Sequence, residues 1–116
     1  MALRVFNKLV RDLIPEQLTA RGIKVTYSVI GDFFGRDRFS REKLVEEAGE
    51  VLKANTREEL IGELADVADT FELVLRVNKV TPEELSLARA KKNKEKGGFE
   101  QFYYLESTEE TDGHPK

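Results

Sequence analysis

Two pairs of acidic residues are the part of this sequence best suited to chemistry. Glu47 and Glu50 form the first pair, and Glu63 and Asp66 form the second. At about 100° per residue, positions three apart lie on one side of a helix, so each pair offers two neighbouring carboxylates. Four converging carboxylates repel one another, and a divalent cation would offset that repulsion. An oxygen-only ligand set favours Mg²⁺, with Mn²⁺ as the alternative, over Zn²⁺.

The competing interpretation of these pairs is a solvated helix surface. Because 22 of the 116 residues are acidic, pairs with this spacing also arise by chance. Helical phase favours the metal site, since Glu47 and Glu50 flank the apolar stripe of their helix, whereas Glu46 lies further toward solvent. Glu63 and Asp66 flank the stripe of the most apolar helix, which we expect to be central and buried.

Two long helices are expected to position these acids. The first spans about 40–54, with Ser40 as a candidate N-cap, and the second runs to about residue 78. Thr56 and Glu59 form the capping-box pattern that begins the second helix. The link between the two helices is short, so we expect them to be antiparallel neighbours whose acid pairs converge.

The remaining elements are shorter. A helix is expected from Asp12, with Pro15 in its first turn and Gly22 at its end. Another opens at Thr81-Pro82 and carries acids in its first turn. β-Branched and aromatic residues predict short strands at 23–30 and 99–105. We therefore expect a mainly α domain over 1–105 and a disordered tail over 106–116.

Composition excludes several classes of site and partner. The chain has no cysteine, and its single histidine, His114, lies in the polar tail, which argues against thiol chemistry and a Ser/His/Asp triad. The net charge of −3 argues against a nucleic acid polymer as the main partner. The sequence holds no apolar run long enough to cross a membrane and nothing typical of a signal peptide, so a cytoplasmic location is the default expectation.

Three segments, in order, resemble one known family. The acidic segments, Glu46-Glu47-Ala48-Gly49-Glu50 and Glu63-Leu64-Ala65-Asp66, resemble the EExxE…ExxD signature of the all-α nucleoside triphosphate pyrophosphohydrolases. That superfamily includes MazG proteins, dimeric dUTPases and phosphoribosyl-ATP pyrophosphohydrolase. A MazG-like subgroup has a similar N-terminal sequence to the opening NKLVRDLIPE (residues 7–16). Its C-terminal Gly-Gly-Phe element resembles the segment KEKGGF (residues 94–99).

The resemblance implies a helical core that dimerises into a four-helix bundle, as a homodimer or a dimer of dimers. It implies Mg²⁺-dependent cleavage of a nucleoside triphosphate to a nucleoside monophosphate and pyrophosphate. By motif position, the metal ligands would be Glu47, Glu50, Glu63 and Asp66. Glu46 also matches the motif, and its implied role is to orient water or a second metal.

Basic residues near both ends are candidates for phosphate binding, and solvated basic surface is the alternative. These residues are Lys8, Arg11, Lys94 and Lys96. Three functions follow from the sequence. The first is hydrolysis of noncanonical nucleotides, the second is phosphoribosyl-ATP hydrolysis in histidine biosynthesis, and the third is a non-catalytic helical dimer. The NKLVRD segment favours the first function over the second, and the complete acid set argues against the third.

Overall fold

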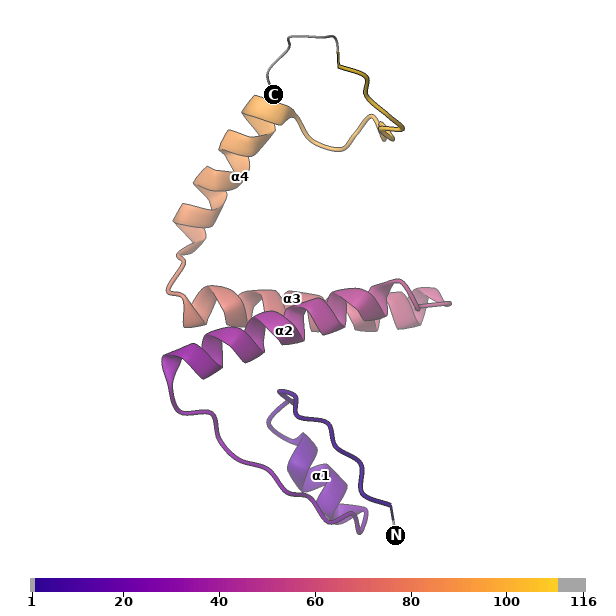
Figure 1. The fold of residues 1–116 in the computed structure, drawn as a ribbon, viewed down its shortest axis with the longest axis vertical. Helices are drawn as coiled ribbons and strands as arrows, with labels where there is room; N and C mark the ends of the chain where they lie inside the picture. The colour runs from indigo at the N-terminus through magenta and orange to yellow at the C-terminus, as the bar shows by residue number, and fades with distance from the viewer. Residues whose placement is uncertain (1, 111–116) are drawn as a thin grey trace. The chain divides into compact units, whose positions relative to one another are not determined.

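The computed structural model describes residues 2–110, and over this range the protein is all-helical (Figure 1). The prediction of a mainly α protein is confirmed. The chain divides into two compact units, Met1–Thr81 and Pro82–Lys116. The first unit contains α1, α2 and α3, and the second contains α4. None of the described helices is long and apolar enough to cross a membrane.

Helix α1 is short and spans Ile14–Ala20. Pro15 lies in its first turn, as predicted, where a missing backbone N–H costs nothing. The helix ends where Gly22 adopts a φ of +82°, a left-handed conformation that favours glycine. The N–H of Gly22 then donates to Thr19 O at 2.9 Å, which closes the last turn.

Helix α2 spans Phe33–Val51 and begins earlier than expected. Asp32 caps it, because the Asp32 carboxylate accepts a hydrogen bond from Gly35 N at 3.1 Å. The prediction of Ser40 as the N-cap was wrong. Ser40 lies inside the helix, only 1% exposed, and its hydroxyl donates to Asp37 O at 2.9 Å. Serine inside a helix commonly satisfies its hydroxyl on the preceding turn in this way.

Helix α3 spans Arg57–Val77 and begins as predicted. The Thr56 hydroxyl accepts from Glu59 N at 3.1 Å, and the Glu59 carboxylate accepts in return from Asn55 N at 3.1 Å. The return bond therefore reaches one residue further back than in the usual capping box. The short link between α2 and α3 makes them antiparallel neighbours, as predicted (Figure 1).

A polar network joins the beginning of α2 to the end of α3. The Asn78 amide donates to Asp37 Oδ1 at 2.8 Å and to Val74 O at 2.9 Å. Arg41 also donates to Asp37, at 2.8 Å. These two donors hold the pKa of Asp37 below its usual range, with the Asn78 hydrogen bond as the larger cause. The network fixes the register between the two helices at the end away from their connecting loop.

Much of the apolar stripe of α3 is exposed in the described part of the chain. Leu60, Ile61, Leu64 and Phe71 are 37–55% exposed, and no apolar side chain of the described residues is fully buried. The less exposed face of α3 is polar as well as apolar, and carries Glu63, Asp66, Val67, Thr70 and Val74. The expectation of a central, buried α3 is therefore not met within one chain, because α2 is the only described helix packed against it.

Helix α4 spans Pro82–Lys96. Its first turn contains Glu83 and Glu84 and its last turn contains lysines, so its charges complement the helix dipole as predicted. The helix stops before Gly97, whose φ is +83° and whose N–H donates to Asn93 O at 2.9 Å.

The two short strands predicted at 23–30 and 99–105 do not form between residues 2 and 110. A strand requires a ladder of backbone hydrogen bonds to a neighbour, and neither segment has one there. Most of their aromatic and β-branched side chains are exposed instead, for example Val29 and Tyr103, whereas Val25 and Ile30 are half-buried. The predicted tail over 106–116 has no helix or strand up to residue 110, and the rest of it, with His114, lies outside the described residues.

Candidate metal centre

Three of the predicted acids converge between the two long helices. Glu47 projects from α2, and Glu63 and Asp66 project from α3. Each offers one carboxylate oxygen, and these oxygens all lie within 4.8 Å of one another. All three residues are half-buried, since they lie on the faces that α2 and α3 turn toward each other. Three oxygens at this spacing could hold a divalent cation.

Like charges crowd this acidic triad. The pKa of Glu63 is raised, mainly by desolvation and then by the neighbouring charges of Asp66, Glu50 and Glu47. A raised carboxyl pKa means that the ionised form is disfavoured where it stands. A cation bound beside Glu63 would favour its ionised form and reverse that effect.

Lys43 supplies part of that positive charge from α2. Its ammonium lies 3.2 Å from Glu47 Oε1 and 3.2 Å from Glu46 Oε2, and its side chain is only 13% exposed. Lys43 is thus the best-shielded cation among those paired with these acids. It was not predicted as a site residue, although its helical phase lies between those of Glu47 and Glu50.

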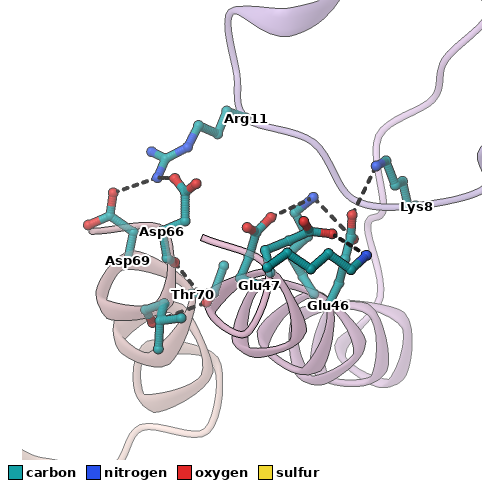
Figure 2. Close-up of polar contacts among 11 residues, drawn as sticks. Lys8, Arg11, Glu46, Glu47, Asp66, Asp69 and Thr70 are labelled. Atoms are coloured by element: carbon teal, nitrogen blue, oxygen red, sulfur yellow. Dashed lines mark hydrogen bonds and ion pairs between the residues drawn. The ribbon is translucent and has the colours of Figure 1, made fainter. Parts of the chain in front are cut away.

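The N-terminal segment contributes two more cations (Figure 2). Lys8 Nζ lies 2.9 Å from Glu46 Oε1, and this hydrogen bond is the main reason that the pKa of Glu46 is lowered. Arg11 Nη2 lies 2.6 Å from Asp66 Oδ1 and 2.9 Å from Asp69 Oδ2. Hydrogen bonds to both aspartates raise the pKa of Arg11. Residues 8 and 11 therefore lie beside the acids of α2 and α3.

Asp69 is a polar residue at this site that was not predicted from the sequence. It follows Asp66 by three positions and so continues the same acidic row along α3. That spacing was the available signal, but Asp69 lies toward the exposed side of the helix and outside the EExxE…ExxD pattern.

The other predicted site residues lie outside the triad. The Glu50 carboxylate is near enough to influence Glu63, but it pairs with Lys53 at 3.5 Å. Glu46 faces Lys8 and Lys43 instead of the triad. Lys94 and Lys96 are in the last turn of α4, which belongs to the second unit.

Comparison with known proteins returns no match. No family model, curated protein or solved structure matches this chain. The case for its chemistry therefore rests on the triad, on the cations around it and on the sequence motifs.

Proposed function

We propose that this protein is a nucleoside triphosphate pyrophosphohydrolase of the all-α, MazG-like type. The observation that carries the proposal is the convergence of Glu47, Glu63 and Asp66 from two helices onto one point. These are the positions at which the EExxE…ExxD resemblance expects metal ligands. Carboxylate oxygens from two rigid helices suit Mg²⁺, or Mn²⁺ in its place.

The reaction is hydrolysis of the bond between the α- and β-phosphates. Water adds to the α-phosphorus, and the oxygen that bridges the α- and β-phosphates leaves with pyrophosphate. A nucleoside monophosphate remains. When bound, Mg²⁺ would neutralise phosphate charge and lower the pKa of the attacking water. The ligand set proposed for it is Glu47, Glu63 and Asp66, with Glu50 one turn beyond Glu47.

The residues of this chain would supply the base and the phosphate contacts. A carboxylate of the proposed ligand set would accept the proton of the attacking water. Lys8 and Arg11 already lie at the acids, where phosphate oxygens would compete for their N–H groups. Lys94 and Lys96 are proposed as further phosphate contacts.

The proposal includes a homodimer, or a dimer of dimers. The exposed stripe of Leu60, Ile61, Leu64 and Phe71 supports it, because the described part of one chain buries no apolar core. Burying that stripe against a second copy would supply the core that α2 and α3 lack.

The competing function is a non-catalytic helical dimer. It is favoured by the ion pairs at the acids, because Arg11 and Lys43 neutralise charge there without any metal. Phosphoribosyl-ATP hydrolysis remains the alternative activity within the same superfamily.

A panel of nucleoside triphosphates with Mg²⁺ tests the function, with pyrophosphate release as the measurement. We expect turnover of at least one noncanonical nucleotide by the native chain. Glu63→Gln should abolish turnover, while Glu72→Gln, a matched charge change on the exposed side of α3, should retain it. No turnover on any nucleotide, phosphoribosyl-ATP included, would favour the non-catalytic dimer.

A further inference from the structure

A cleft beside the triad is formed by the N-terminal segment and α2. Phe6, Lys8 and Leu9 line it on one side, and Phe39, Glu42, Lys43 and Glu46 line it on the other. Its volume is about 310 Å³. Ligand pockets span roughly 300–1,000 Å³, so this cleft is at the small end of that range and has room for one flat ring system.

The lining combines flat apolar surfaces with a polar edge. Phe6 and Phe39 offer aromatic surfaces for stacking, and Leu9 adds an apolar wall. The Phe6 ring is 58% exposed, and the Arg4 guanidinium and Lys8 Nζ lie over it at 5.2 and 5.7 Å from its centroid. A nucleobase pocket needs these same two properties, a stacking surface and hydrogen-bonding groups at the rim.

Glu46 provides the acceptor at that rim. One of its oxygens accepts from Lys8 at 2.9 Å and the other accepts from Lys43 at 3.2 Å. An ionised carboxylate has about four acceptor positions, so capacity for N–H donors of a ligand remains. Such a group favours bases that present an amino group over bases that present only carbonyl oxygens there.

Lys43 joins the cleft to the triad. Its ammonium contacts Glu46, which lines the cleft, and Glu47, which belongs to the triad, at the same distance of 3.2 Å. A ligand with its base in the cleft would therefore extend its phosphates past Lys43 toward the proposed metal ligands. No part of this path leaves the first unit of the chain.

We propose that this cleft is the base-binding site of the substrate and that Glu46 accepts a hydrogen bond from an amino group of the base. The inference rests on the proposed function for the identity of the ligand, a nucleotide. It gives Glu46 a part in substrate selection and leaves the metal to the triad.

The first test removes the stacking surfaces. Phe6→Ala and Phe39→Leu should each raise KM for the nucleoside triphosphate about tenfold while kcat changes little. KM for inorganic tripolyphosphate, which has no base, should not change. Phe34→Ala is the matched control, because Phe34 is an exposed aromatic residue of α2 outside the cleft. If KM for the nucleoside triphosphate is the same in both variants and in the native chain, the cleft is not the base-binding site, and the proposed function still stands.

The second test measures binding without turnover. Calorimetry with guanosine and inosine monophosphates, which differ by one amino group, should show tighter binding of guanosine monophosphate by the native chain. Phe6→Ala should weaken both, and Glu46→Leu, which has no acceptor, should remove the preference. If neither monophosphate binds the native chain, the base-binding site is refuted. If, in addition, no triphosphate is hydrolysed, the proposed function is refuted as well. Binding that Phe6→Ala abolishes, without turnover of any triphosphate, would support the cleft and refute the enzyme.

Discussion

At the scale of single residues, the candidate centre is a balance between three carboxylates and the cations that face them. Glu47 has Lys43 and Asp66 has Arg11, whereas the raised pKa of Glu63 reflects burial and like charge. Glu63 is thus the member whose charge is least compensated. A divalent cation would change its environment most, which makes it the most informative position to substitute.

Arg11 should compete with the metal. Its guanidinium pairs with Asp66 Oδ1 at 2.6 Å, so a metal ion that binds this oxygen must displace the guanidinium. Arg11→Ala should tighten Mn²⁺ binding up to about fivefold, the range expected for an exposed ion pair, and should raise KM for the triphosphate. Titration of Mn²⁺ checks the first effect and steady-state kinetics the second.

Arg21→Ala removes the same charge just after α1 and serves as the control. Weaker Mn²⁺ binding in Arg11→Ala than in Arg21→Ala would show that Arg11 supports the metal instead of competing with it.

At the scale of elements, most helix ends followed from local chemistry visible in the sequence. Thr56 with Glu59 and Thr81 with Pro82 mark helix beginnings that the structure confirms. Ser40 was misassigned because Asp32, eight residues earlier, caps the helix, and its carboxylate accepts from Gly35 N inside the first turn. A Cβ on Gly35 would lie 2.8 Å from a methyl group of Ile30, so this glycine serves close packing and not a turn.

Strands were harder to predict because a pattern of alternating side chains does not show whether a neighbouring strand is available for backbone hydrogen bonds. Segments 23–30 and 99–105 have suitable residues, yet a ladder depends on contacts far along the chain. The convergence of Glu47 with Glu63 and Asp66 was predictable, since a short loop joins the helices. Lys8 and Arg11 were predicted as candidates for phosphate binding because they are basic, but their pairing with Glu46 and Asp66 needed the three-dimensional structure.

The register between α2 and α3 should depend on pH through Asp37. Its folded pKa lies below the unfolded value, so its contribution to stability is present above the unfolded pKa. That contribution is lost as pH falls through the folded pKa. Asn78→Ala should therefore lower Tm at pH 7, and the difference from the native chain should shrink at about pH 3, near the ordinary aspartate pKa.

Thermal unfolding followed by circular dichroism measures this effect. Asn93→Ala is the matched control, because the Asn93 amide donates to the backbone O of Arg89 within α4. A Tm difference for Asn78→Ala that is the same at both pH values would contradict the role of the Asp37 charge.

At the scale of the whole molecule, residues 2–110 lack an apolar core. Only Ser40 and Thr70 are buried in that range, and the stripe on α3 stays exposed. The sequence predicted this stripe as a buried face, but a pattern cannot state whether its partner is the same chain or another copy. In the proposed homodimer, a second copy supplies the missing surface.

Leu64→Asp should convert the dimer to monomer, because a charge in the middle of the stripe would be buried without a partner. The same substitution at Leu3, an exposed residue of the N-terminal segment, should leave the dimer intact. Light scattering coupled to size exclusion gives the mass of each variant. A native chain that is monomeric at all concentrations would refute the dimer, as would a Leu64→Asp variant that stays dimeric.

Binding of Mn²⁺ is the measurement that tests the candidate centre most directly. Electron paramagnetic resonance of Mn²⁺ titrated into the native chain should show a bound ion. Glu63→Gln should weaken that binding at least about tenfold, as expected for loss of a metal-site carboxylate, while Glu72→Gln on the same helix should not. Absence of bound Mn²⁺ in the native chain, or equal binding by Glu63→Gln, would contradict the metal centre on which the proposed function rests.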